Sequence, residues 1–301
     1  MLALDRINKV YSTGSFGRGR LRAVRDVSFD VGPGEVVSLI GESGSGKSTI
    51  GKLILRLLRL TSGAIAFDGT DIATVKTGRL KGYYAEVQGV FQDPFSSYNP
   101  IFKADRVYSM LRSEYFSGLS NSEWQQKLEG SLEAVGLNPD DVLSKYPHQL
   151  SGGQLQRMLI ARALLLDIRL LVADEIISML DASTRIDVLN LLGDLKGRGL
   201  GILFITHDLS LGNYISDRTL ILRRGRVVEL GPTSKVFGDP RHSYTRALLS
   251  CVPQLHRKWS DEANGEVAVE ADDLPAAAAA NGGGLVAVDA DHFVAPEEDL
   301  A

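Results

Sequence analysis

The pattern of apolar and polar positions divides the chain into short strand-like runs and segments with helical spacing. Between several of the runs, apolar residues recur every three to four positions, as they do on one face of a helix. Strands that alternate with helices predict an α/β fold with a mainly parallel, doubly wound sheet, whose ligands collect at the carboxyl ends of the strands. The predicted strands lie at about 3–10, 23–31, 36–40, 64–68, 87–91, 169–174, 201–206, 219–223 and 226–231.

Two helical predictions stand out. The run from Ser48 to Leu60 predicts an amphipathic helix that packs on the sheet. Between about 96 and 168 the strand pattern disappears and helical spacing takes over, which indicates a helical subdomain inserted into the α/β core. On the first helix the apolar face would comprise Ile50, Leu53, Ile54, Leu57 and Leu58, and the polar face Lys52, Arg56 and Arg59.

Composition places the chain among globular proteins. It has 301 residues, 44% of them hydrophobic, enough for one large core or two smaller ones. No apolar run approaches the roughly 20 residues that span a bilayer, and the segment Met1 to Arg6 is too short and too charged for a secretory signal. We therefore expect a cytoplasmic protein. The single cysteine, Cys251, excludes an internal disulfide and a cysteine-rich metal site, and we expect it to be buried.

Charge is distributed unevenly around the net value of −4. All 33 Lys and Arg precede residue 260, whereas 11 of the 37 Asp and Glu follow residue 259, so the first 259 residues carry a net charge of +7. The tail, 260–301, is acidic and rich in Ala and Gly, which predicts disorder and no contribution to the core. We therefore expect removal of 261–301 to leave the melting temperature and activity nearly unchanged.

A phosphate-binding loop is predicted between the apolar run 36–40 and the first helix. Gly41 to Ser48 match the pattern G-x-x-x-x-G-K-[ST]. Crowded phosphates need backbone N–H groups at close range, which glycines permit, and a helix N-terminus with partial positive charge. Lys47 would supply a mobile cation and Ser48 a hydroxyl for Mg²⁺.

Three further motifs lie where polar side chains could reach a nucleotide. Asp174 and Glu175 follow a buried strand, so that Asp174 could hold Mg²⁺ through water and Glu175 could orient or deprotonate an attacking water. His207 follows another apolar strand and could reach a γ-phosphate. The segment Leu150 to Gln154, Leu-Ser-Gly-Gly-Gln, opens a helix and forms a second anion site, which suits a nucleotide bound elsewhere.

The order of these motifs, together with Gln92 and the segment Ser178 to Asp181, resembles the ATP-binding-cassette (ABC) ATPase superfamily across about residues 1–235. The resemblance implies a phosphate-loop (RecA-like) ATP-binding-cassette core with an antiparallel β subdomain and an inserted helical subdomain. It also implies ATP and Mg²⁺ as ligands. The ABC ATPase domain would cover 1–240, with the helical subdomain at about 96–168.

The resemblance assigns the catalytic roles residue by residue. Glu175 would act as the catalytic base and His207 as the γ-phosphate switch, while Lys47 binds phosphate. Gln92 would sense Mg²⁺ and water. The metal ligands would be Ser48, Gln92 and Asp174.

ATP would bind in a dimer of cassettes. Family members pair head to tail, so Ser151 and Gly153 of one subunit would close on the ATP of the other, and Asp181 would cross the interface. Tyr11 would stack on adenine. The remaining predicted ATP-binding residues are Gly41, Ser43, Gly44, Gly46, Lys47, Ser48, Thr49, Gly152 and Gln154.

One motif departs from the family pattern. Relatives usually read Glu-Pro-Thr-Ser-Ala-Leu-Asp, whereas Ile176, Ile177 and Met179 here replace Pro, Thr and Ala. Loss of the proline reduces local rigidity. Because Glu175 and Asp181 remain, we expect hydrolysis to survive.

Finer resemblance points to dipeptide and oligopeptide importers. It rests on segments 41–49, 90–100 and 237–249, and 48–52 is similar to the second of the two ATPase subunits that such systems carry. An extension of that type would occupy 241–259. The cysteine-containing extension with which many relatives end is absent. The same branch includes oligosaccharide and nickel importers. These stay open, because proteins outside this chain select the solute.

The resemblance also implies partners and rules against other classes. We expect a second, nonidentical ABC ATPase subunit, two transmembrane permeases and, indirectly, an extracellular solute-binding protein, with the chain at the cytoplasmic face of the inner membrane. The permease contact is predicted near Phe95 to Pro100. A soluble relative acting on nucleic acid or ribosomes would need coiled-coil insertions, zinc-type cysteine pairs or two cassettes, so no nucleic acid is expected. A regulatory module that binds nucleotide without hydrolysing it would be expected to lack Glu175 or His207, and both are present here.

Overall fold

The computed structural model describes residues 1–13, 19–251 and 284–297, which divide into two compact units. Unit 1 comprises Met1–Val31, Val36–Ala73 and the described residues from Phe204 onward. Unit 2 comprises Gly32–Glu35 and Thr74–Leu203. In the described parts, no helix is both long and apolar enough to cross a bilayer.

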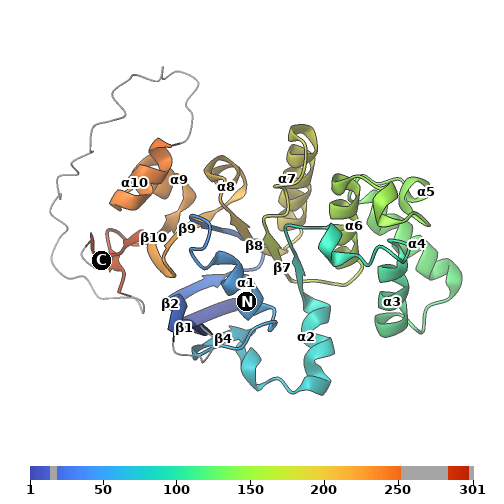
Figure 1. Ribbon diagram of the computed structural model, residues 1–301, viewed down its shortest axis with the longest axis horizontal. Coiled ribbons are helices and arrows are strands. Elements are labelled where there is room, and N and C mark those ends of the chain that lie inside the picture. Colours follow the sequence, from blue (N-terminus) through green and yellow to red (C-terminus); the bar gives the residue numbers. More distant parts are fainter. Residues whose placement is uncertain (14–18, 252–283, 298–301) are drawn as a thin grey trace. The chain divides into compact units, whose positions relative to one another are not determined.

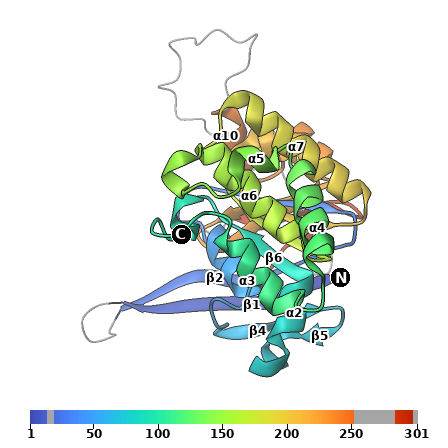
Figure 2. The same ribbon diagram turned by 90° about the vertical axis from the view of Figure 1, so that its right-hand side faces the viewer.

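An antiparallel sheet with the strand order β2-β1-β4-β5 opens unit 1. Its two long strands lie side by side as a ribbon (Figure 2). Alternate residues of β1 face inward, because Leu2 and Leu4 are buried while Ala3 is exposed. The strands are β1 (Leu2–Thr13), β2 (Gly19–Val31), β4 (Ser62–Phe67) and β5 (Thr70–Asp71).

The second group of strands in unit 1 has the order β11-β12-β10-β9-β3. Figure 1 labels two of them, β9 and β10, which lie side by side. Only β3 and β9 pair in parallel; the other neighbours are antiparallel. The strands are β3 (Val36–Ile40), β9 (Arg218–Arg223), β10 (Arg226–Pro232), β11 (Val286–Ala287) and β12 (Phe293–Val294). The helices are α1 (Lys47–Ile54), α8 (Leu209–Ile215), α9 (Thr233–Gly238) and α10 (Ser243–Ser250).

Unit 2 combines a parallel strand pair with a group of helices (Figure 1). No strand occurs in 96–168, the stretch expected to be helical. Strand β8 (Gly201–Thr206) carries the chain back into unit 1. The other elements are α2 (Leu80–Glu86), β6 (Val87–Val90), α3 (Arg106–Tyr115), α4 (Asn121–Glu133), α5 (Pro139–Val142), α6 (Gly152–Leu164), β7 (Leu170–Asp174) and α7 (Ala182–Gly197). Among the described residues of unit 2, 3₁₀ turns lie at Thr77–Arg79, Phe95–Ser97 and Pro147–Gln149; a further one, Ile72–Thr74, begins in unit 1.

All nine predicted strands are confirmed, but the helix predicted from Ser48 to Leu60 is too long. Helix α1 ends at Ile54, and Arg56 adopts a left-handed φ of 53°. The carbonyl of Lys52 then accepts from the N–H groups of Leu57 and Leu58, which closes the helix. Leu57 is 56% exposed. The chain must turn here to begin β4, so tertiary structure overrides the helical pattern.

The expectations for the C-terminal region need correction. Residues 284–297 do pack within unit 1: β12 pairs with β10, and Leu285 and Val294 are buried. The reason is that β10 offers a strand partner and a buried acidic side chain, neither of which the composition of the tail reveals. The rest of the tail, 260–283 and 298–301, lies outside the described residues, as does 252–259 of the extension. Cys251, expected to be buried, is exposed.

Candidate functional site

The loop between β3 and α1 has two positions at which a Cβ atom would clash with a backbone carbonyl, so that only glycine fits there. A Cβ on Gly41 would lie 2.1 Å from the carbonyl oxygen of Leu222. Gly46 has a φ of 109°, and a Cβ there would lie 2.3 Å from the carbonyl oxygen of Ala23. Both glycines are therefore required by close backbone approach, as expected of a loop that presents its N–H groups to a ligand.

Lys47 lies folded over this loop and is 5% exposed. Its Nζ donates to the carbonyl oxygens of Gly41 and Glu42 at 2.7 and 2.8 Å. In both of these contacts the partner of the ammonium is a backbone carbonyl oxygen. An anion in the loop would attract it strongly, because Lys47 is largely shielded from water.

The N-terminus of α1 suits an anion. Its N-cap, Gly46, has no side chain to cap the first N–H groups, and the first turn contains no acidic residue. The partial positive charge of the helix end is therefore not offset by a capping side chain or by an acid in that turn. Ser48, in the first turn, is exposed. The loop thus provides a cation, a helix end and a hydroxyl, which together can bind a phosphate group.

Two further predicted residues belong to unit 1. Tyr11 lies on β1, half-buried, with Lys9 Nζ 5.1 Å from the centre of its ring. His207 follows β8 and is exposed. The next residue, Asp208, caps α8 by accepting from Ser210 N at 2.9 Å, so the turn after His207 is fixed by a cap that the sequence analysis missed although Asp is a preferred N-cap residue.

In unit 2, a fully buried strand delivers the acidic pair. Every residue of β7 is buried, including Asp174, which is 5% exposed at its carboxyl end. Glu175 adopts a left-handed φ of 51°. Its carbonyl oxygen accepts from the N–H and the Oγ of Ser178 at 3.1 and 2.9 Å. The carboxylate of Glu175 therefore sits on a tight, hydrogen-bonded turn.

The atypical residues after Glu175 are packed rather than loose. Ile176 and Ile177 are 1% and 2% exposed, while Met179 is 60% exposed. Arg185 holds the end of the segment, because its Nε donates to the carbonyl oxygen of Leu180 at 2.8 Å. Apolar burial thus restrains this segment in place of the usual proline.

Asp181 caps helix α7. Its Oδ1 accepts from Thr184 N at 2.9 Å and from Ser183 Oγ at 2.7 Å, and its Oδ2 accepts from Thr184 Oγ1. The hydrogen bonds from Ser183 and Thr184 lower the pKa of Asp181 well below its usual value. Asp181 is therefore an anion at neutral pH.

Ser151 and Gln154 form a capping box at the start of α6. Gln154 N donates to Ser151 Oγ at 3.1 Å, and Ser151 N donates to Gln154 Oε1 at 2.9 Å. The two glycines between them face the segment that follows Glu175: a Cβ on Gly152 would lie 3.9 Å from Met179 O, and one on Gly153 would lie 3.6 Å from a methyl of Leu180. The structure therefore brings two of the predicted motifs together within unit 2.

Gln92 lies on an exposed loop after β6. Two side chains of α6 that the sequence analysis missed donate to the backbone on either side of Val90. Gln156 Nε2 lies 3.3 Å from Phe91 O, and Arg162 Nη2 lies 2.9 Å from Gly89 O. The strand that leads to Gln92 is thus tied to α6, the helix that Ser151 caps. Helical spacing alone could not have shown that these residues face backbone acceptors.

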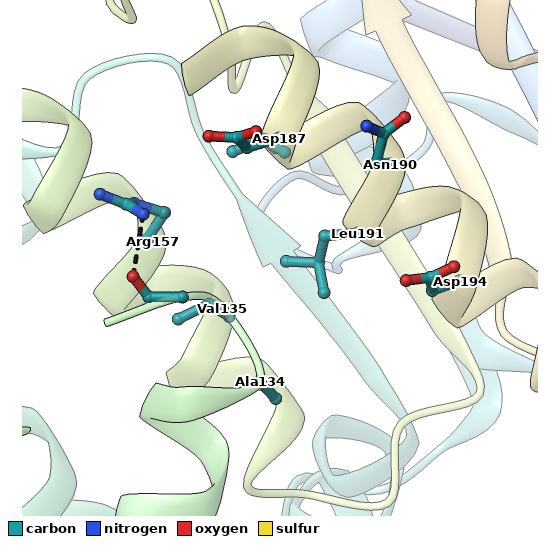
Figure 3. Close-up of a pocket in the computed structure, with 9 residues that line it drawn as sticks. Ala134, Val135, Arg157, Asp187, Asn190, Leu191 and Asp194 are labelled. Carbon is teal, nitrogen blue, oxygen red and sulfur yellow. Dashed lines mark hydrogen bonds between the residues drawn. The ribbon is translucent and has the colours of Figure 1, made fainter. Parts of the chain in front are cut away.

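The predicted residues fall on both units. The phosphate loop, Tyr11 and His207 belong to unit 1. Gln92, Asp174, Glu175, Asp181 and the segment 151–154 belong to unit 2. Unit 2 also has a pocket of about 360 Å³ between α6 and α7 (Figure 3). None of the predicted nucleotide residues lines it, so it is separate from the candidate site.

The sequence matches two family descriptions. Residues 24–178 match "ABC transporter", and residues 228–278 match "Oligopeptide/dipeptide transporter, C-terminal region". A peptide import ATP-binding protein of Brucella ovis is 42% identical over 84% of this chain and 78% of its own length. The glutathione import ATP-binding protein of Salmonella typhi is also 42% identical, over 80% of this chain and 39% of the relative.

Solved structures agree with the sequence comparisons. The dimeric ATP-binding cassette MJ0796, in a post-hydrolysis state with ADP and phosphate, superposes with a TM-score of 0.70 at 29% identity, over 77% of this chain and 99% of that one. The protein cbiO1 of Clostridium perfringens, part of an ABC transporter complex, has a TM-score of 0.67 at 26% identity, over 79% and 90%. From its motifs, its fold and these relatives, the chain belongs to the ABC transporter family of ATP-binding subunits.

Proposed function

We propose that this chain is the ATP-hydrolysing subunit of a membrane ABC importer for dipeptides or oligopeptides. One observation carries the proposal: a single chain combines an ABC transporter match at 24–178 with an oligopeptide/dipeptide transporter C-terminal match at 228–278. The peptide import ATP-binding protein at 42% identity supports the same class of solute.

ATP would bind first to the loop of unit 1. The N-terminus of α1 and Lys47 attract the phosphates, and the glycine backbone permits their close approach. Tyr11 offers an aromatic ring to the adenine. The negative charge of the phosphates would compete with the carbonyl oxygens of Gly41 and Glu42 for the ammonium of Lys47.

Hydrolysis would then require a base and a well-oriented water. Glu175 is suited to accept a proton from that water, because its turn fixes the backbone that carries the carboxylate. Gln92 would orient the water and His207 would contact the γ-phosphate. Mg²⁺, when bound, would neutralise phosphate charge; Ser48, Gln92 and Asp174 offer the hard oxygen ligands that this cation prefers.

The site would be completed by a second cassette. The capping box of Ser151 leaves its hydroxyl and the first N–H groups of α6 at the start of a helix, where an anion is stabilised. Ser151, Gly153 and Asp181 would act on ATP held by the loop of another subunit. We propose that this subunit is nonidentical, that two permeases carry the pair, and that an extracellular binding protein supplies the solute.

A group of exposed apolar side chains marks the proposed permease contact. Phe95 is 51% exposed, Ile101 76% and Phe102 40%. They follow Gln92 along the chain, so a permease segment packed here could respond to the occupancy of the nucleotide site. Through this contact the chain would associate with the cytoplasmic face of the membrane without spanning it.

Uptake by cells tests the proposal. The gene would be deleted from its host and replaced by the wild type or by Lys47→Ala, and uptake of labelled dipeptides, longer peptides, oligosaccharides and nickel would be measured. We expect peptide uptake alone to be lost on deletion, restored by the wild type and not by Lys47→Ala. Loss of oligosaccharide or nickel uptake with normal peptide uptake would overturn the assignment of solute.

A further inference from the structure

Helix α10 reaches the phosphate loop through one side chain. The N–H of Glu42, the second residue of the loop, donates to the Oη of Tyr244 at 3.4 Å. The ring of Tyr244 is held on one side by Arg223, whose guanidinium carbon lies 4.8 Å from the ring centre. Tyr244 also shares a core cluster with Ile40, the residue immediately before the loop. It is 7% exposed, so its hydroxyl has little freedom to move.

The start of α10 is fixed by a buried polar group. Tyr244 N donates to His242 Nδ1 at 3.0 Å, and His242 is fully buried. The carboxylate of Glu229, on β10, accepts from the N–H groups of Arg241 and His242 at 2.8 and 3.1 Å. The position of Tyr244 is therefore set by contacts with β10 as well as by apolar packing.

The C-terminal segment, residues 284–297, also contacts this region. Glu297 accepts from the N–H and the Oγ of Ser243, the first residue of α10, at 2.9 and 2.6 Å. His292 Nε2 lies 2.8 Å from Glu229 Oε1. Ala295 N donates to Val228 O at 2.8 Å, and Ala295 packs on the cluster that contains Tyr244.

We propose that Tyr244 is a positioning residue of the ATP site and that the C-terminal segment acts on the phosphate loop through it. The segment would clamp the N-terminus of α10, α10 would present Tyr244, and the tyrosine hydroxyl would hold the backbone of Glu42. This inference rests on the proposed binding of ATP at the loop. It adds a control on nucleotide affinity that lies outside the ABC core motifs.

The proposal has a defined energetic scale. The loop contact is long for a hydrogen bond and involves no ionised partner, so removal of the hydroxyl should weaken ATP binding on the order of 2- to 10-fold. Loss of the Glu297 side chain should weaken ATP binding by a similar or smaller factor, because Glu297 contacts α10 and not the phosphate loop. If both act along one route, their effects should not add.

Binding of Mg²⁺-ATP to the full chain, measured by titration calorimetry, tests the proposal. The variants are Tyr244→Phe, which keeps the ring and loses the hydroxyl, Glu297→Ala, and the two combined. We expect each single variant to raise the Kd several-fold and the double variant to match Tyr244→Phe. The melting temperature without nucleotide should change little for Tyr244→Phe, which separates positioning from general stability.

A matched control is available in unit 2. Tyr115 Oη donates to the carbonyl oxygen of Lys81 at 3.3 Å. The centre of its ring lies 5.2 Å from Lys81 Nζ, so this tyrosine, like Tyr244, also contacts a cation. Tyr115→Phe removes a comparable hydrogen bond and should leave the Kd for ATP unchanged. Wild-type affinity in Tyr244→Phe, or fully additive effects of the two substitutions, would overturn the inference. Equal ATP affinity in Lys47→Ala and the wild type would instead overturn the proposed nucleotide site itself.

Discussion

Glu175 combines the proposed role of base with an unusual backbone conformation. A φ of 51° is uncommon for a residue other than glycine, and such conformations concentrate at functional sites. Glu175→Gln preserves shape and removes the base, so we expect near-normal ATP affinity and a loss of turnover by orders of magnitude in the assembled transporter. Phosphate release is the measurement. Glu133→Gln, on an exposed position of α4, is the control, and normal turnover in Glu175→Gln would exclude the base role.

Two glycines of the phosphate loop make a second test at the scale of single residues. Gly44 and Gly46 both have a positive φ, of 81° and 109°. A Cβ at position 44 meets no atom within 4 Å, whereas at position 46 it would lie 2.3 Å from Ala23 O. Gly44→Ala should cost about 1–2 kcal/mol of stability from backbone strain alone. Gly46→Ala should cost more stability and also abolish ATP binding. Denaturant melts of both variants measure the loss of stability, and titration calorimetry measures ATP binding. Equal stability of the two variants, or normal ATP binding by Gly46→Ala, would contradict the prediction.

At the scale of elements, the C-terminal segment is expected to stabilise unit 1. Its removal would expose the apolar side chains that pack beneath it and would take from the buried carboxylate of Glu229 its contact with His292, while the N–H groups of Arg241 and His242 would still donate to it. Loss of one hydrogen bond to a charged group costs about 1.5–3 kcal/mol. We therefore expect a chain that lacks 284–301 to melt several degrees lower than the full chain. A chain that lacks only 298–301 should melt normally, and equal melting of all three would show that the segment does not dock.

The same region should respond to pH. Burial disfavours the charged form of His242 and lowers its pKa below 6.5, so the folded protein binds fewer protons than the unfolded chain, and stability falls as the pH drops below about 6.5. Burial opposes ionisation of Glu229, but hydrogen bonds, chiefly from His292 and Arg241 N, outweigh it and lower its pKa below 4.5. Its contribution is present above about pH 4.5 and is lost as the pH falls through the lowered value.

Thermal melts between pH 8 and pH 4 should therefore show a decline that begins near pH 6.5 and steepens below 4.5. His242→Asn can still accept from Tyr244 N as a helix cap, but it cannot titrate. In this variant the first part of the decline should vanish while the second remains. An unchanged profile would mean that His242 does not control stability in this range.

Elements differed in how far the sequence could predict them. Strands β3, β7 and β8 are buried at every position, so their apolar runs were unambiguous. Two-residue strands such as β5 and β12 are too short to show a period. The end of α1 was missed because Leu57 and Leu58 continue the helical pattern into a turn. Docking of the C-terminal segment was missed because it depends on His292 and Glu229, which are far apart in the sequence.

The residues of the candidate site also differ in how far the sequence could predict them. Gly41, Gly46 and Lys47 could be predicted because close approach to phosphate demands those residue types at a fixed spacing. The roles of Gln156 and Arg162 could not, since nothing in a helical pattern identifies the backbone carbonyls that their side chains meet. The packing of Ile176 and Ile177 likewise required the structure.

At the scale of the whole molecule, the chain alone should be a poor ATPase. If relatives' head-to-tail pairing holds, the loop of one subunit needs the Ser151 region of another, and an open site should lose orders of magnitude in rate. Turnover should be compared for the purified chain and for the complex with its second cassette and permeases. Ser151→Arg should abolish turnover in the complex, while Ser122→Arg, exposed on α4, should not. A chain that alone turns over as fast as the complex would contradict the trans mechanism.

The pairing of β12 with β10 has a consequence for solubility. Without it, β10 would present unpaired N–H and C=O groups around Glu229 and Leu230 along the margin of a sheet, a template on which a second chain could add a strand. Strands β12 and β11 cover this margin and contain two residues each. Lys235 of α9 forms ion pairs with Asp289 and Asp291, which lie between these two strands in the sequence. So short a final strand offers little for another copy to pair with, which protects the protein from self-association through this side.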